Sequence, residues 1–193
     1  MKERVENQME QSLEQLKRIM LDYDYFLYIA EKLEWLDVEE QYEEWRHHYP
    51  LNMLLEVYKF PQDYDILHHM ADVYVRVVFS SMAHYEEWEP GYWDVSREER
   101  RQRLKAEYML YWYEQYATFA ELRLRRRDWT HLANEIKSFA VENDVLPFSY
   151  QKQYLDSFEN AKVIELGGYY AGDATYWAIK HNTLLVVSCG FWD

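Results

Sequence analysis

The sequence predicts a predominantly helical α+β protein, in which an N-terminal helical bundle packs with a small C-terminal antiparallel β-sheet of about three strands. Through most of the chain, apolar residues recur at three- and four-residue steps, which is the period of a helix. The last third instead holds short β-branched runs separated by turn residues. Because 49% of the 193 residues are hydrophobic, we expect one domain over 1–193, with a helical part at 1–146 and a β-rich part at 147–193.

Four helices are expected in the N-terminal half. Residues 5–36 fit one long amphipathic helix, whose apolar face would be formed by Leu13, Leu16, Met20, Tyr23, Leu27 and Ala30. Helices at 38–48 and 51–59 would each end before a proline, because the residue before a proline avoids the α region. The segment 65–85 contains a β-branched stretch that also fits a strand, but its length and its lack of turn residues favour a helix.

A long central helix is expected at 97–127, because Ser96 and Glu99 fit a capping box at its start. This helix would be apolar on two sides, so it would lie in the centre of a bundle or form a homodimer. Its ends are basic, and its arginines are expected to pair with the acidic N-terminal helices, within the chain or across a dimer. Asp128 can cap a further helix at 129–142.

Three strands are expected in the last third of the chain, at 162–166, 174–180 and 183–189. Gly167-Gly168 and His181-Asn182 would supply the turns between them. The last strand is apolar on both faces, so we expect it to be the most covered strand of the sheet.

The composition excludes several classes of protein. The chain carries 35 acidic and 21 basic residues, a net charge of −14, which argues against direct binding to nucleic acid or to anionic membranes. Eighteen per cent of its residues are aromatic, which excludes an acidic disordered chain, and one cysteine excludes a disulfide framework. No secretory signal or membrane-spanning apolar run is visible, so a cytoplasmic protein is expected.

The negative charge is concentrated before residue 96. Residues 1–95 hold 21 acids and 8 bases (−13), residues 96–130 hold 6 and 9 (+3), and residues 131–193 hold 8 and 4 (−4). Acidic residues mixed with aromatic ones form two clusters that we take as the candidate binding site: Glu34, Asp37, Glu39, Glu40, Glu43, Glu44 and Trp45, and then Glu86, Glu87, Trp88, Glu89 and Asp94. Rows of carboxylates on a helix can imitate nucleic-acid phosphates, and aromatic residues between them can anchor in pockets of a basic protein. The alternative is a solvated acidic face whose aromatic residues point into the core.

Two features would favour an enzyme. The pairs Glu44/His47 and Asp128/His131 have the spacing of metal-carboxylate bundles, and His68 with Asp72 could chelate a divalent metal on a helix. Cys189 could act as a thiol nucleophile if His181 were its base. Asp128 is better explained as a helix cap, and a cysteine on an apolar strand is usually a small buried hydrophobe, so we expect no cofactor and no metal.

The sequence therefore favours a non-enzymatic acidic module that binds a basic protein surface. By analogy of size and charge, we expect an inhibitor of a nucleic-acid-binding nuclease, of the anti-CRISPR or anti-restriction type found in phages and mobile elements. A toxin-neutralising immunity protein is the alternative in the same class, and a metal-carboxylate or thiol enzyme is the alternative in another class.

Overall fold

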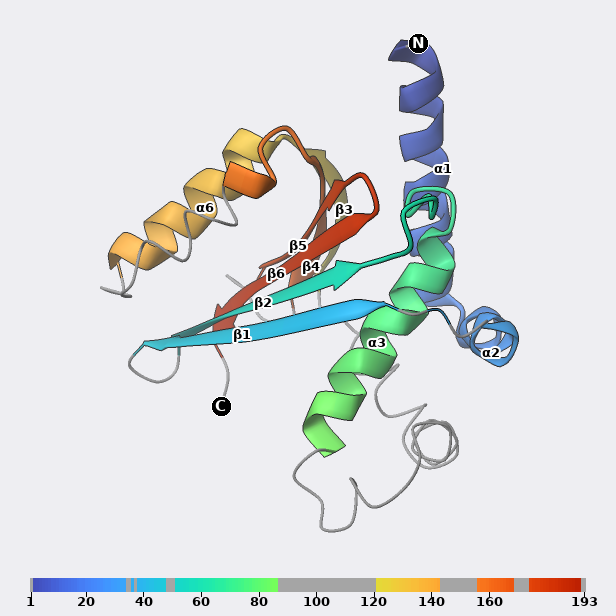
Figure 1. Cartoon of the computed structure of the whole chain (residues 1–193), viewed down its shortest axis with the longest axis horizontal. Coiled ribbons are helices and arrows are strands. Elements are labelled where there is room, and N and C mark those ends of the chain that lie inside the picture. Colours follow the sequence, from blue (N-terminus) through green and yellow to red (C-terminus); the bar gives the residue numbers. More distant parts are fainter. Residues whose placement is uncertain are drawn as a thin grey trace. The chain divides into compact units, whose positions relative to one another are not determined.

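The computed structural model describes residues 2–33, 36, 38–47, 51–86, 121–142, 156–168 and 174–191. They form an α+β protein with two compact units (Figure 1). The helical unit contains α1 (Lys2–Leu21), α2 (Tyr23–Lys32) and α3 (Met70–Glu86). The sheet unit contains all the described strands and α6 (Trp129–Glu142). No helix in the described ranges is long and apolar enough to cross a membrane.

The described strands form one antiparallel sheet of six strands, rather than the three expected. The strands are β1 (Glu39–His47), β2 (Leu51–Lys59), β3 (Glu121–Arg127), β4 (Lys162–Gly168), β5 (Ala174–Lys180) and β6 (Thr183–Phe191). Their order is β1-β2-β6-β5-β4-β3, and every neighbouring pair is antiparallel. β6 therefore lies inside the sheet, while β1 and β3 form its two edges.

The helices predicted at 38–48 and 51–59 are wrong, because these segments form β1 and β2. The two strands pair over nine residues each, and β2 pairs over its whole length with β6 on its other side. Met53 and Leu55 of β2 are buried in the core of the sheet unit at the two-residue period of a strand. β1 is held by its neighbour in sequence, β2, and β2 is held in addition by the distant β6. These pairings override the helix propensity of glutamate and leucine.

The helix predicted at 97–127 is wrong at its C-terminal end. Residues 121–127 form β3, which pairs with β4, and residues 97–120 lie outside the described residues. Two arginine-rich stretches can look like one charged helix in the sequence, although the second is a strand held by a partner nearly 40 residues away. The homodimer proposed for this helix also falls on residues that are not described.

The long helix predicted at 5–36 is two helices, because the chain breaks at Asp22. This residue is extended (φ −129°, ψ 97°), and its Oδ1 accepts a hydrogen bond from the Tyr25 amide at 3.0 Å. Asp22 is therefore the N-cap of α2, a role that aspartate fills well because it satisfies an amide that the helix leaves unpaired. The helix predicted at 65–85 is confirmed as α3, which begins later, at Met70.

The described helices of the helical unit, α1, α2 and α3, pack through buried apolar residues. Leu16 of α1, Phe26 of α2 and Val73 of α3 are buried, and the rings of Phe26 and Tyr74 meet edge to face at 6.5 Å. Ser12 is also buried, and its Oγ donates to the Leu67 carbonyl at 2.6 Å. Residues 67–69 before α3 are thereby attached to α1.

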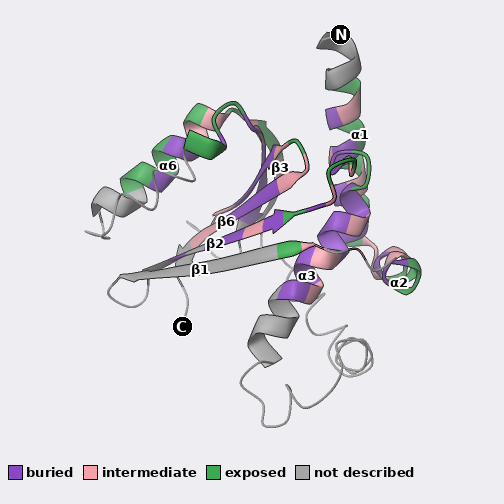
Figure 2. Cartoon of the chain, in the orientation of Figure 1, coloured by how far each residue is buried: buried purple, intermediate pink, exposed green. Residues whose placement is uncertain are grey.

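The core of the sheet unit lies between α6 and one face of the sheet. Twelve buried residues form it: Met53, Leu55, Leu132, Ala133, Ile136, Phe158, Ala161, Val163, Tyr176, Ala178, Leu185 and Val187. The intervening residues Ile164, Trp177 and Val186 are buried as well, so the central strands have two buried faces (Figure 2). The prediction that the last strand is the most covered is wrong for the described residues: β6 has four consecutive buried residues, Leu184–Val187, whereas β4 has five, at 163–167.

The C-terminal elements confirm the predicted helix at 129–142 and the three predicted strands. Asp128 Oδ1 accepts a hydrogen bond from the His131 amide at 2.7 Å, as expected for the N-cap of α6. His181 takes the left-handed conformation (φ 54°) in the turn before β6. The turn expected at Gly167-Gly168 is wrong, because both glycines belong to β4. Gly167 (φ 117°) adjoins a register shift between β4 and β5, where a residue without a Cβ can take that angle.

Candidate binding edges of the sheet

The structure places five of the predicted site residues on β1, an edge strand of the sheet. Glu39, Glu40, Glu43, Glu44 and Trp45 are thus on a strand and not on the expected helix. Glu86 is the last residue of α3. The remaining predicted site residues lie outside the described residues: Glu34, Asp37, Glu87, Trp88, Glu89 and Asp94.

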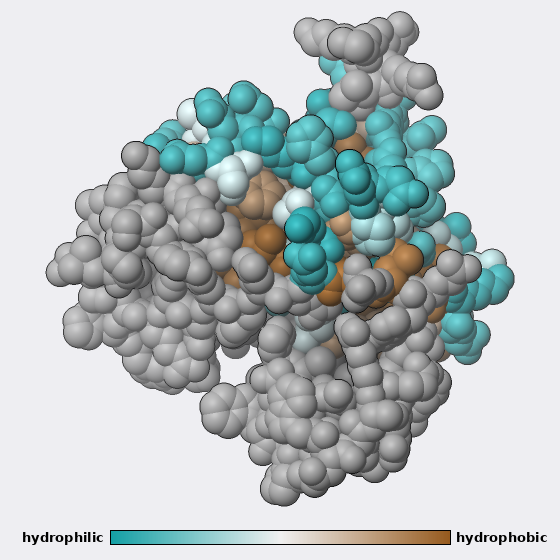
Figure 3. Space-filling view, in the orientation of Figure 1, coloured by the Kyte–Doolittle hydropathy of each residue, from teal (hydrophilic) through white to brown (hydrophobic). Residues whose placement is uncertain are grey.

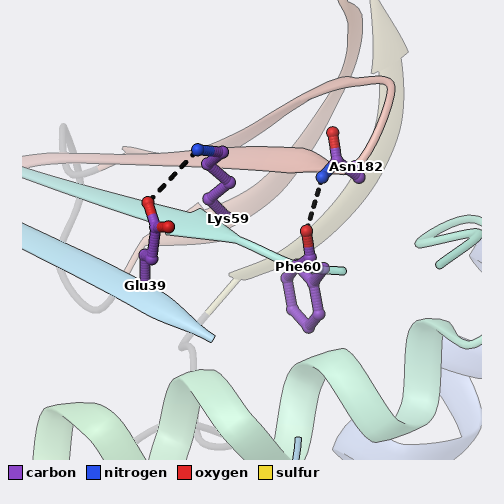
Figure 4. A network of polar contacts seen from close by, with 4 residues as sticks. All are labelled: Glu39, Lys59, Phe60 and Asn182. Atoms are coloured by element: carbon purple, nitrogen blue, oxygen red, sulfur yellow. Dashed lines mark hydrogen bonds and ion pairs between the residues drawn. The ribbon is translucent and has the colours of Figure 1, made fainter. Parts of the chain in front are cut away.

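β1 is a regular edge. It pairs with β2 from Glu39 to His47 without a register shift, and no described strand pairs with its other side. Glu39 leaves 74% of its side chain exposed and forms an ion pair with Lys59 Nζ at 3.2 Å (Figure 4). An exposed pair of this kind contributes about 0–1 kcal/mol. The charge of Glu39 is therefore exposed at the start of β1 and adds little to stability.

The end of β2 is fixed to the turn before β6. The Phe60 amide donates to the Asn182 carbonyl at 2.9 Å, and the Asn182 side-chain amide donates to the Phe60 carbonyl (Figure 4). These reciprocal bonds continue the β2–β6 pairing by one residue beyond Lys59. They hold the strand on which β1 is built, so the acidic edge has a rigid support.

The opposite edge of the sheet, β3, is basic. After Glu121 it carries Arg123, Arg125, Arg126 and Arg127. Arg125 and Arg126 are exposed, whereas the Arg127 side chain is partly buried, with 31% of its surface exposed. The pairing with β4 shifts register between Leu122 and Arg125 and is then regular from Arg125 to Arg127. The sheet thus has one acidic and one basic edge.

Arg127 of this edge bonds a buried partner, Glu165. Its Nε donates to Glu165 Oε2 at 2.5 Å, and the Glu165 side chain is only 5% exposed. The hydrogen bond to Glu165 is the main cause that raises the pKa of Arg127 above its ordinary value. Glu165 is the only charged residue among the buried positions of β4. An acid within an apolar strand signals that some partner is needed, but it does not identify Arg127.

Tyr176 lies beside this pair on β5, opposite Glu165 in the strand register. Burial, helped by the negative charges of Glu135 and Glu165, raises the pKa of Tyr176 to about 12. The ring of His131 from α6 meets the Tyr176 ring at 5.9 Å, and its Nε2 is buried without a hydrogen-bond partner among the described residues. Tyr176 is therefore a neutral phenol at neutral pH, and this polar cluster joins α6 to the β3 side of the sheet.

The residues considered for catalysis are not assembled into a site in the described ranges. Glu44 and His47 lie on a strand, so the helical spacing expected of that pair is absent. Asp72 forms a 3.9 Å ion pair with His69 rather than with His68, and no group of three metal-ligating residues occurs among the described residues. His181 precedes β6 and Cys189 lies near its end, roughly 25 Å away at the rise of a strand.

The described surface offers charge rather than large apolar patches. Its exposed large hydrophobic side chains are Leu21 and Tyr28, both in the helical unit. Hydrophilic residues cover most of the described surface in the view of Figure 3. The charged residues of the two edge strands are therefore the features of the sheet unit that we consider for recognition by another molecule.

No family model, no curated protein and no solved structure matches the chain.

Proposed function

We propose that this protein is a non-enzymatic binding module whose acidic edge strand β1 occupies a basic surface of another protein. The observation that carries the proposal is the position of Glu39, Glu40, Glu43 and Glu44 on one edge strand, supported from behind by β2 and β6. A sheet edge offers unpaired backbone groups, and the carboxylates add a negative potential along it. A basic segment or groove of a partner could bond the backbone groups and neutralise the carboxylates.

The target best suited to such a strand is the nucleic-acid channel of a nuclease. These channels are lined by lysine and arginine that normally neutralise phosphates, and carboxylates on a rigid strand would compete for the same residues. The protein would then act as a steric and electrostatic inhibitor of the anti-CRISPR or anti-restriction type. A toxin-neutralising immunity protein is the second candidate, in which β1 would cover a small basic toxin.

A competition assay tests the proposal. A panel of restriction and CRISPR nucleases bound to fluorescent duplex DNA is titrated with the protein, and release of the DNA is followed by anisotropy. We expect release by at least one enzyme at about 50 mM salt, with a steep loss of potency at about 500 mM because the ions screen the contact.

The matched variants E40Q/E43Q/E44Q and E6Q/E10Q/E14Q each remove three charges, the first from β1 and the second from exposed positions of α1. Only the β1 variant should lose potency. Equal loss in both variants would mean that net charge alone acts, and potency independent of salt would contradict the electrostatic mechanism. Binding to a small basic toxin, without any effect on the nucleases, would select the immunity role.

A further inference from the structure

The two edges of the sheet carry opposite charges of equal size. β1 holds four glutamates and Arg46, a formal net of −3, and β3 holds Glu121 and four arginines, a formal net of +3. Both edges belong to one sheet in one compact unit, and no described strand pairs with the outer side of either. Two copies of the chain therefore present complementary edges to each other.

The order of charges along the strands selects one orientation. β1 begins with its glutamates and reaches Arg46 near its end, while β3 begins with Glu121 and ends with its arginines. An antiparallel pairing of β1 with β3 sets acids opposite arginines and Arg46 near Glu121. A parallel pairing cannot bring Arg46 and Glu121 together, because they lie at opposite ends of their strands, and the register that aligns the two strand starts sets Glu39 opposite Glu121.

We infer that β1 of one molecule pairs antiparallel with β3 of a second copy, so that the sheet continues from molecule to molecule. The inference stands on the two edges and does not depend on the proposed function. Pairing of β1 with β1, or of β3 with β3, would bring together edges of the same net charge. The contact is therefore head-to-tail, and such contacts produce rings or open chains rather than a closed two-fold dimer.

The part of β3 that can receive a new strand is short. Arg127 is engaged with Glu165, whereas Arg125 and Arg126 are exposed on the regular stretch that follows the register shift. The shift bends the preceding residues of β3, which limits pairing there. We therefore expect a weak association that is sensitive to salt and depends on Arg125 and Arg126.

Sedimentation velocity across a range of protein concentrations tests the inference. At about 50 mM salt, the average molecular mass of the wild-type protein should rise with concentration and should continue beyond the mass of a dimer. At about 500 mM salt, the protein should be monomeric. The edge variants E43K/E44K and R125E/R126E should each weaken association at least about tenfold. Mixing the two variants should restore association, because one supplies an intact β3 and the other an intact β1.

Two control variants separate this contact from general charge effects. E6K/E14K and K17E/K137E make the same charge changes at exposed helical positions and should associate like the wild type. Urea unfolding of all four variants checks that each one folds. A monomeric wild-type protein at every concentration, a closed dimer that survives R125E/R126E, or a mixture that stays monomeric would each overturn the inference.

Discussion

At the scale of single residues, the Arg127–Glu165 pair limits which arginines of the basic edge β3 can contact another molecule. Glu165 is buried on β4, so its carboxylate needs a partner that is fixed in place. Arg127 supplies it from the neighbouring strand, while Arg125 and Arg126 remain exposed. Arg127 thus serves the stability of the sheet unit, whereas Arg125 and Arg126 lie on its surface.

Replacing Arg127 should therefore be costly, while replacing its neighbour should not. R127M keeps the apolar stem but leaves the Glu165 carboxylate without its partner, and we expect the free energy of unfolding to fall by about 2 kcal/mol. R125M should change it by no more than about 0.5 kcal/mol. The double variant R127M/E165Q should recover part of the loss, because it removes the buried charge. Urea unfolding measures all three, and equal values for R127M and R125M would show that the pair is not structural.

Tyr176 predicts how stability depends on alkaline pH. Its pKa is about 12 in the folded protein and about 10 in an unfolded chain, so between these values the unfolded state loses the proton first. The contribution of Tyr176 is thus complete below pH 10 and is lost as the pH rises toward 12. From about pH 9 to about pH 11.5, the wild-type protein should lose about 1–2 kcal/mol more stability than Y176F.

Urea unfolding of the wild type and Y176F along this pH series measures that difference. The same series with Y28F, which removes the hydroxyl of a half-exposed tyrosine, is the control. Parallel slopes for wild type and Y176F would show that the phenol is not shielded in the folded state.

At the scale of elements, the sequence predicts correctly those segments whose signal is local. α6 has its cap in Asp128 and its apolar period in Leu132 and Ile136, and β5 and β6 have β-branched runs around a turn. β1 has no such signal, because glutamate is a good helix former and only pairing with β2 makes the segment a strand. The acidic residues of the candidate site could therefore be identified from composition, whereas their position on a sheet edge could not.

The basic edge strand β3 cannot be predicted from the sequence for a related reason. The sequence pattern predicts that the arginines of 121–127 end a long helix and pair with other charged helices. The structure places them on a strand whose partner, β4, comes 35 residues after its end. Glu165 was missed because a single acid in an apolar strand gives no sign of which residue will neutralise it. Both errors concern contacts between distant segments, which no local pattern encodes.

At the scale of the whole molecule, the uneven charge distribution connects the two proposals. If β1 binds both β3 of a second copy and a basic partner, the two contacts exclude each other, since both occupy the same edge. At high protein concentration, self-association would then cover β1 with β3 of a second copy. A basic partner would have to displace that β3 in order to bind. By linkage, the apparent affinity for the partner falls as the fraction of occupied edges rises.

This competition can be measured with a fluorescent oligo-lysine peptide as a probe for β1. At protein concentrations above the onset of association, R125E/R126E should bind the peptide more tightly than the wild type, because its β1 edge stays open. The variant is also more acidic, so K17E/K137E, which carries the same added charge and still associates, is the reference. We expect R125E/R126E to exceed this reference by about threefold to tenfold in the associating range and to equal it on dilution. Equal affinities of the two variants at all concentrations would show that self-association and partner binding use different surfaces.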